Sequence, residues 1–286
     1  MSRAKNVITI ALDWLAGTFN GGSKHELEFI NKYASAATVQ PSTPRHGYTD
    51  ATVDGNGVNV LWNTSRDEMG THVVLPGSSL RKLQELSGVQ LETLLRDATN
   101  AGLKISRLDL AKDIIGQAID LETVYQSLVG GRNAGTARTF SKIQSNDGGF
   151  TVYVGSRQSE KFIRIYNKAA QEGISNQHWY RYELETKGMV ARAVATSLTQ
   201  SGNWSGVFDA VSLAMLELGT SSPIAAFYSQ NDIPVGIPKI ERTSDREKWI
   251  SEQVIPAVSK HFSEHPDSDA VQRLIAILKF MSDSQL

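Results

Sequence analysis

Three segments of the chain alternate between apolar and functional side chains with a period of two, and this pattern constrains the fold more than any other feature. The segments are residues 107–113, 161–168 and 181–187. Successive side chains of a β-strand point to opposite faces. Each segment is therefore predicted to be a strand with one face in a core and the other carrying polar groups. One-sided burial explains the alternation, but it does not explain which polar groups recur.

The segment 161–168 is predicted to carry a nucleophile. Ile163 and Ile165 fall on its apolar face. The other face combines aromatic and basic side chains, namely Phe162, Arg164, Tyr166 and Lys168. A tyrosine flanked by two cations on one face can hold a phosphate against its hydroxyl oxygen. We therefore interpret Tyr166 as a nucleophile for cleavage of a DNA phosphodiester, forming a covalent phosphotyrosine.

The other two segments carry carboxylates on their polar faces, and these are predicted to hold a metal ion. The residues are Asp109, Asp113, Glu183 and Glu185. Carboxylates two residues apart on a strand project in the same direction, roughly 6.5–7 Å apart at the backbone. With a carboxylate from a neighbouring strand they could bind Mg²⁺ or Mn²⁺ through oxygen. Such an ion would polarise the phosphoryl oxygen.

Several basic residues accompany these groups and are predicted to contact DNA phosphate: Arg107, Lys161, Arg164, Lys168 and Arg181. Between residues 130 and 170 seven basic and two acidic residues leave a local excess of five positive charges, although the whole chain has a net charge of −1. A solvated surface could also carry such a run. Its interleaving with strand-like apolar residues favours a nucleic-acid surface.

Each of these residues also has a purely structural interpretation. A solvated strand face explains Glu183 and Glu185. Ion pairs with Arg107, Lys112 or neighbouring strands explain Asp109 and Asp113. A tyrosine in a strand is usually a packing residue, and Tyr153, Tyr180 and Tyr182 are interpreted in that way. The hypothesis rests on the joint pattern.

The composition is that of a globular protein of 286 residues, with 40% hydrophobic and 21% charged residues and no cysteine. Disulfides and cysteine-based zinc sites are excluded. The first apolar run is short and interrupted by Asp13, so we expect no signal peptide. No segment has the roughly 20 apolar residues of a membrane span, and a cytoplasmic location is expected.

The order of predicted elements indicates an α+β fold with a mostly antiparallel sheet and flanking helices. Residues 54–57, Asp-Gly-Asn-Gly, are the strongest hairpin signal. Helices are predicted over 91–100 and 121–129, with Asp120 as a cap. After about residue 200 the pattern becomes helical. We therefore expect a sheet-rich catalytic domain over 1–200 and a helical region over 201–286.

Five short blocks, in order, make the chain resemble the replication initiation factor (Rep_trans) family. This family covers initiators of rolling-circle plasmids and filamentous-type phages and some related conjugative relaxases. The blocks are Leu-Asp-Trp-Leu at 12–15, Arg-Leu-Asp-Leu-Ala-Lys-Asp at 107–113, Tyr-Val-Gly-Ser-Arg-Gln-Ser at 153–159, Arg-Ile-Tyr-Asn-Lys at 164–168 and Arg-Tyr-Glu-Leu-Glu at 181–185.

The resemblance implies a sheet related to the HUH nuclease core, with carboxylates in place of the histidine pair. It implies that Tyr166 nicks DNA and that Asp109, Glu183 and Glu185 lie at the metal, with Asp113 as a further acidic position. It also implies a double-strand origin as substrate, a host helicase as partner and a possible homodimer. None of the six histidines lies two residues from another, which agrees with the carboxylate variant.

Three other functions remain open from the sequence. A conjugative relaxase would use the same chemistry. A DNA-binding regulator could keep the fold without catalysis, although the intact Tyr166 and its carboxylates count against it. A surface-charged α+β protein with no nucleic-acid role would show no salt-dependent DNA binding.

Overall fold

The computed structural model describes residues 7–34, 39–146, 149–228, 235–236, 254–266, 268–273 and 276. Its contacts divide the chain into two compact units, residues 1–239 and 240–286. The predicted boundary at residue 200 falls earlier, because helix α7 (Trp204–Met215) packs against α6 (Gly188–Ser201) and so lies in the first unit. In the second unit the structure describes α9 (Ile255–Glu264) and a helical turn over 269–273. The rest of this unit, which falls in the helical region expected over 201–286, lies largely outside the described residues.

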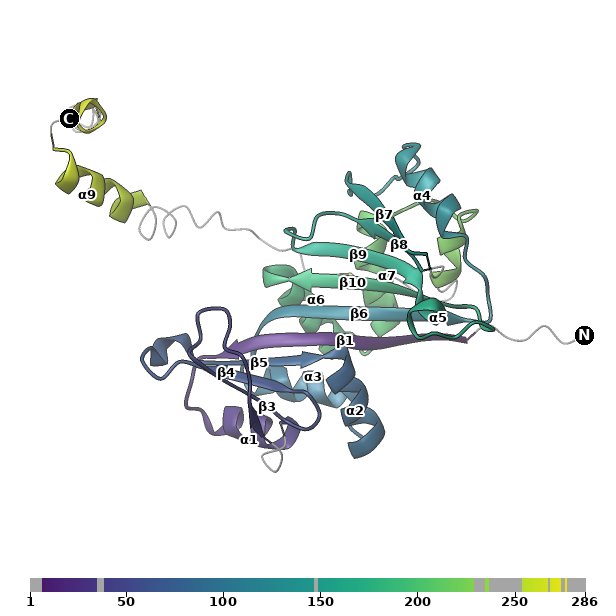
Figure 1. Ribbon diagram of the computed structural model, residues 1–286, viewed down its shortest axis with the longest axis horizontal. Helices are drawn as coiled ribbons and strands as arrows, with labels where there is room; N and C mark the ends of the chain where they lie inside the picture. Colours follow the sequence, from purple (N-terminus) through teal and green to yellow (C-terminus); the bar gives the residue numbers. More distant parts are fainter. Residues whose placement is uncertain are drawn as a thin grey trace, which may run out of the picture. The chain divides into compact units, whose positions relative to one another are not determined.

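Ten strands of the first unit form one sheet in which every pairing is antiparallel. Its order is β2-β3-β4-β5-β1-β6-β10-β9-β8-β7, and Figure 1 shows its central strands side by side. The bounds are β1 Val7–Phe19, β2 Gln40–Pro41, β3 Asp50–Val53, β4 Asn59–Trp62, β5 Thr71–Pro76, β6 Lys104–Ile115, β7 Phe140–Gln144, β8 Phe150–Val154, β9 Lys161–Asn167 and β10 Trp179–Lys187. The α+β class with a mostly antiparallel sheet is thereby confirmed.

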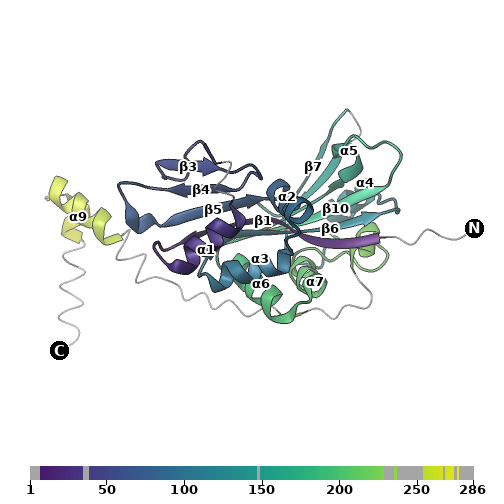
Figure 2. The same ribbon diagram turned by 90° about the horizontal axis from the view of Figure 1, so that it is seen from below.

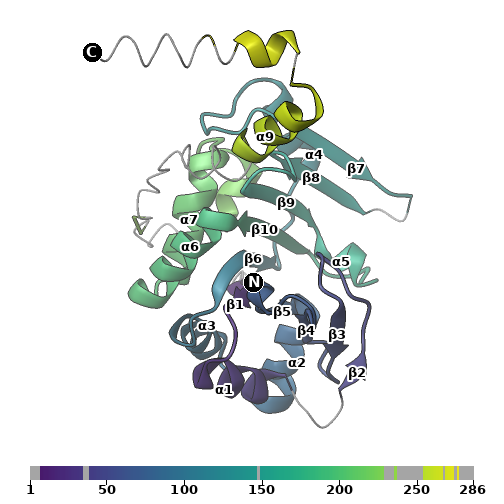
Figure 3. The same ribbon diagram turned by 90° about the vertical axis from the view of Figure 1, so that its left-hand side faces the viewer.

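Helices lie on both sides of this sheet. The further helical elements are α1 Lys24–Tyr33, η2 Asp67–Met69, α2 Gly77–Ser87, α3 Leu91–Asn100, α4 Leu121–Val129, α5 Lys168–Gln171 and η3 Pro223–Phe227. Figures 2 and 3 show α3, α6 and α7 together on one face. Helices α2 and α5 lie on the opposite side, toward which both ends of the sheet curve in these views. One face is therefore covered by helices, and the other is partly open.

The core lies between the central strands and α6 and α7. The apolar positions of the three alternating segments face these helices and are fully buried: Leu108, Leu110, Ile163, Ile165, Tyr182 and Leu184. Tyr182 packs edge-on against Phe208 of α7, with ring centroids 5.1 Å apart. Burying these side chains on one face obliges the alternate residues of β6, β9 and β10 to project from the other.

A buried ion pair joins this core to α7. Lys112 of β6 and Asp209 of α7 lie 2.6 Å apart between Nζ and Oδ1, and they are 1% and 2% exposed. The sequence left Lys112 as a possible partner of the carboxylates in its own segment. The structure places it on the helix-covered face instead, because it alternates with Ala111 and Asp113.

Local sequence chemistry explains several turns. In the hairpin between β3 and β4, Asp54 Oδ1 accepts hydrogen bonds from the backbone N–H of Asn56 and Val58, at 3.0 and 2.8 Å. Gly57 has a positive φ of 89° there. At α4, Asp120 Oδ1 accepts from Thr123 N at 3.0 Å, as its predicted capping role requires.

One expected strand boundary is wrong. The strand predicted over 161–168 ends at Asn167, whose Oδ1 accepts a hydrogen bond from Ala170 N at 3.0 Å and caps the short helix α5. Lys168 is therefore the first residue of α5. Helix α2 begins at Gly77, directly after Pro76, and no side chain caps its N-terminus. Residues 40–41 form the short strand β2 at the edge of the sheet.

Candidate active site

The open face of the sheet carries the predicted polar groups in register. Strand β10 lies between β6 and β9, so the three alternating segments are neighbours. Glu185 lies opposite Asp109 and Arg181 opposite Asp113 in the β10–β6 pairing. In the β10–β9 pairing, Arg181 lies opposite Tyr166, and Glu183 opposite Arg164. Side chains opposite each other in antiparallel strands are direct neighbours, and this register brings the predicted tyrosine to the predicted carboxylates.

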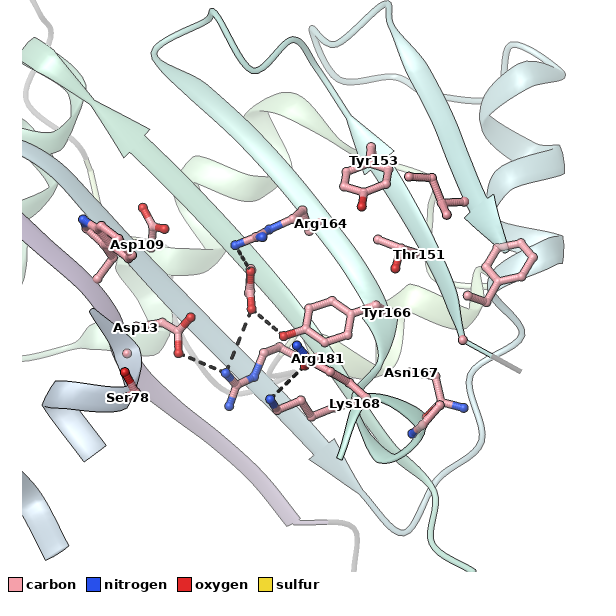
Figure 4. A pocket seen from close by; sticks show the side chains of 18 of the residues that line it. Asp13, Ser78, Asp109, Thr151, Tyr153, Arg164, Tyr166, Asn167, Lys168 and Arg181 are labelled. Carbon is pink, nitrogen blue, oxygen red and sulfur yellow. Dashed lines mark hydrogen bonds and ion pairs between the residues drawn. The ribbon is translucent and has the colours of Figure 1, made fainter. Parts of the chain in front are cut away.

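These groups lie at a cavity of about 710 Å³. Strands β1, β6, β9 and β10 supply its floor, with Asp109, Arg164, Tyr166, Arg181 and Glu183 among the lining residues. Helix α2 borders it on one side, and the β7–β8 hairpin borders it on the other. Figure 4 shows Asp13 and Ser78 on the first side and Thr151 and Tyr153 on the second. The cavity is thus framed by segments from most of the first unit.

Tyr166 donates a hydrogen bond from its hydroxyl to Glu183 Oε1 at 2.5 Å, shown as a dashed line in Figure 4. Glu183 is 4% exposed. Burial, the charge of Glu183 and this hydrogen bond together raise the pKa of Tyr166 above its ordinary value. The phenol is therefore neutral in this state, and Glu183 holds the atom to which its proton can pass.

The cations that flank Tyr166 in the sequence do not contact its hydroxyl. Arg164 pairs with Oε2 of Glu183. Lys168 pairs with Glu172 and donates a hydrogen bond to Gln171 Oε1 at 2.9 Å. The two cations that were expected to hold a phosphate against this oxygen each pair with a carboxylate in the structure. Arg164 acts on the carboxylate that accepts the tyrosine hydrogen bond, and Lys168 lies in α5 at the cavity wall.

Arg107 joins two of the predicted metal ligands. Its Nη2 lies 2.5 Å from Asp109 Oδ2 and 2.8 Å from Glu185 Oε2. Lys187 also pairs with Glu185, at 2.7 Å. The guanidinium stacks on Trp14, 4.4 Å from the ring centroid. The oxygens of Asp109 and Glu185 thus converge on one cationic nitrogen in the structure.

Asp113 occupies a different place in the site. Its two carboxylate oxygens accept hydrogen bonds from Arg181 Nε and Nη2, at 2.7 and 2.8 Å. Arg181 Nη1 also donates to Asp13 Oδ1 at 3.0 Å. Asp113 and Asp13 therefore hold Arg181 between them, beside Tyr166.

The sequence interpretation did not identify Asp13 as a site residue. The pairing of β1 with β6 shifts register between Leu12 and Trp14, so Asp13 is the extra residue of a β-bulge. Helix α2 starts beside it, because Pro76 pairs with Trp14. A Cβ on Gly77 would lie 2.7 Å from Asp13 Oδ1, so this close approach requires glycine. The available signal was an acidic residue inside an otherwise apolar strand.

The chemistry of the carboxylates fits a hard divalent cation. Asp109, Glu183 and Glu185 offer only oxygen, the donor that Mg²⁺ and Mn²⁺ prefer. Burial raises the pKa of Asp109 to about 7, although Arg107 partly offsets it, and burial also raises the pKa of Glu183. A bound cation would offset that cost. Within the described ranges no three acidic or histidine side chains converge as a ready ligand set, since arginines pair with each of these carboxylates.

Some of the remaining predicted residues line the cavity and others do not. Lys161 falls on the helix side of β9, opposite Thr186, and does not line the cavity. Tyr182 is a packing residue, as expected. Tyr153, interpreted as packing, does stack on Phe162 with ring centroids 5.8 Å apart, but it also lines the cavity. Of the residues named for DNA contact, Arg107, Arg164, Lys168 and Arg181 line the cavity.

Comparison with known proteins first identifies the class of fold. The chain is similar to a solved structure described as a rolling circle replication initiator protein from Geobacillus stearothermophilus. The TM-score is 0.64 and the identity is 24%, over 73% of this chain and 86% of that chain. At this identity the likeness shows the fold, an α+β arrangement around a large antiparallel sheet.

A separate comparison matches part of the chain to a family model. Residues 103–215 match the model of the Rep_trans family, the replication initiation factor family. This match confirms the resemblance drawn from the five short blocks, four of which fall inside it. The fifth block, at 12–15, lies on β1 beside the matched segment. Among curated proteins nothing matches the chain. In the part of the chain that the structure describes, no helix is both long and apolar enough to span a membrane.

Proposed function

We propose that the protein initiates rolling-circle replication by metal-dependent, site-specific nicking of DNA, with Tyr166 as the nucleophile. The observation that carries the proposal is the hydrogen bond from Tyr166 to Glu183. A buried carboxylate with a raised pKa, bonded to a phenol, is the arrangement expected of a general base and its nucleophile. The family match at residues 103–215 supports the same function.

In the proposed reaction, the oxygen of Tyr166 attacks the phosphorus of the scissile phosphodiester while its proton passes to Glu183. The bond between phosphorus and the 3′-oxygen breaks, and that oxygen takes a proton from solvent water to become a free 3′-hydroxyl. The DNA 5′-phosphate remains on Tyr166 as a phosphotyrosine. Because a phosphodiester replaces a phosphodiester, the reverse attack by a 3′-hydroxyl can reseal the strand.

A divalent ion, when bound, would stabilise the negative charge that develops on the phosphoryl oxygens. Asp109, Glu183 and Glu185 are the residues proposed to hold it. Arg107 and Arg164, which now pair with these carboxylates, would then become available to DNA phosphate. Asp113 is the least suited of the predicted ligands, because Arg181 already engages both of its oxygens.

A DNA-binding regulator without catalysis is less well supported than an enzyme. Such a protein has no need of a buried base bonded to a tyrosine, and raising the pKa of a carboxylate by burial costs stability. The proposed partners are a double-strand origin with a single-stranded nick site, a host helicase and a second copy of the chain. The helicase and the homodimer rest on the family resemblance alone.

The test is formation of a covalent protein–DNA adduct. The protein is incubated with a supercoiled plasmid that carries its own gene and flanking DNA, in Mg²⁺ or Mn²⁺, and the products are separated under denaturing conditions. We expect nicked or relaxed plasmid and an adduct. Tyr166→Phe should abolish the adduct and leave DNA binding intact.

The matched control is Tyr153→Phe, which removes a hydroxyl from the same cavity and should leave the adduct unchanged. An adduct that persists in Tyr166→Phe and disappears in Tyr153→Phe would move the nucleophile to Tyr153. Tyr182 is not an alternative nucleophile, because it lies fully buried on the other face of the sheet.

A further inference from the structure

Five cationic side chains line the cavity at Tyr166, and four of them are neutralised by the protein itself. They are Arg81, Arg107, Arg164, Lys168 and Arg181. Arg107, Arg164 and Arg181 pair with carboxylates of the floor. Lys168 pairs with Glu172. A phosphodiester entering this cavity therefore meets cations that already have anionic partners.

Arg81 is the exception. It forms no ion pair or hydrogen bond with any residue in the described part of the chain, and its side chain is exposed. It lies on α2, one turn after Gly77 and Ser78, and all three line the cavity. The opposite side of α2 is buried through Leu80 and Leu83. The helix is thus anchored in the core with Arg81 turned toward the cavity.

Arg81 also faces the helix that follows the nucleophile. The pKa of Glu172, at the end of α5, lies below its ordinary value chiefly because Lys168 is bonded to it, and the positive charge of Arg81 adds to the lowering. Arg81 and three residues of α5, Lys168, Ala170 and Gln171, line the same cavity. A DNA strand with one phosphate at Tyr166 carries its neighbouring phosphates along the same cavity, which Arg81 also lines.

We propose that Arg81 binds a backbone phosphate of the nicked strand next to the scissile one, so that α2 holds the DNA in line with Tyr166. The inference rests on the proposed function for its account of the scissile phosphate. An arginine that is not hydrogen-bonded to a carboxylate gains a charge-assisted hydrogen bond on binding phosphate and breaks none. The paired arginines must first give up a carboxylate. Arg81 can therefore bind phosphate while the arginine–carboxylate pairs on the floor of the cavity stay intact.

The experiment measures the affinity of the full-length protein for a fluorescent single-stranded oligonucleotide of mixed sequence, by anisotropy at several salt concentrations. For Arg81→Gln we expect affinity to fall about tenfold at moderate salt. The slope of log K against log salt should become shallower by about 0.7, the contribution of one phosphate contact to single-stranded DNA. Arg81→Lys should keep most of the slope, because it keeps the charge.

The matched control is Arg96→Gln, which removes an exposed helical arginine that does not line the cavity. It should leave the slope and the affinity unchanged. Thermal unfolding of all variants should match that of the wild type, since both arginines are exposed. An Arg81→Gln variant with wild-type slope and affinity overturns the proposal, as does an Arg96→Gln variant that loses as much as Arg81→Gln.

Adduct formation separates this inference from the proposed function. If the wild type forms an adduct with the plasmid and Arg81→Gln forms it at the same rate at low DNA concentration, Arg81 is not a DNA contact. If Arg81→Gln is slow at low DNA concentration and recovers at saturating DNA, its role is in binding. If the wild type forms no adduct but Arg81→Gln still loses the salt slope, the nicking function fails and the phosphate contact stands.

Discussion

The buried pair between Lys112 and Asp209 gives a quantitative test of the packing beneath the site. We consider Lys112→Met, which keeps the length of an apolar stem and removes the charge. Asp209 would then be left 2% exposed without the cation that lies 2.6 Å away. Removing one partner of a buried pair typically costs about 3–5 kcal/mol. The cost is large because a buried carboxylate that loses its counter-charge is poorly stabilised in a low dielectric.

The assay is thermal and urea unfolding. For a unit of this size, 1 kcal/mol shifts Tm by roughly 2–4 °C, so Lys112→Met should lower Tm by roughly 6–20 °C. The double variant Lys112→Met with Asp209→Leu should recover much of the loss, because replacing both partners by apolar side chains is often neutral. A single variant as stable as the wild type, or a double variant no better than the single one, would refute the buried-pair reasoning.

Two further predictions concern the base and the pH dependence of stability. Glu183→Gln should slow adduct formation by about 10²–10⁴-fold, because the amide cannot take the proton of Tyr166, while oligonucleotide affinity measured by anisotropy stays within a few-fold of wild type. Burial, with the nearby charges of His46 and Arg45, lowers the pKa of His72 to about 4. Since an unfolded histidine titrates near 6.5, the unfolded chain binds more protons between these values, and stability should fall as pH drops from 6.5 toward 4. Urea midpoints at pH 5 and pH 7 should converge in His72→Gln if the reasoning is correct, and equal pH dependence in the variant and the wild type would contradict it.

Much of the site was predictable because strand periodicity is a local property of the sequence. Ile163, Ile165 and Leu184 lie in the core. Because side chains alternate between the two faces of a strand, Tyr166 and Glu183 must then project from the opposite face. The adjacency of the three strands was not contained in that pattern. It depends on the sheet order, which places β10 between β6 and β9 and which periodicity alone does not specify.

The residues that were misassigned or missed depend on features that side-chain alternation does not reveal. Lys168 was assigned to the strand because its parity fits, but the side chain of Asn167 caps a helix and ends the strand first. Asp13 was overlooked because a bulge changes the parity of β1 at that residue. Arg81 lies far from Tyr166 in sequence, and its place at the cavity follows only from the packing of α2 beside β1. Local pattern thus predicted the strands, whereas bulges, caps and strand order needed the structure.

The contact between Asp13 and Arg181 joins residues separated by 168 positions, and this separation has a consequence for synthesis of the chain. Strand β10 inserts between β6 and β9, which precede it, so the centre of the sheet cannot close until residue 187 has been made. Pairing over such separations is slow, because the intervening chain must first be ordered. A chain interrupted after β9 would contain Tyr166 without Glu183. On a ribosome, therefore, Tyr166, the proposed nucleophile, emerges before Glu183, its proposed base, and an unfinished chain cannot form the hydrogen bond that joins them.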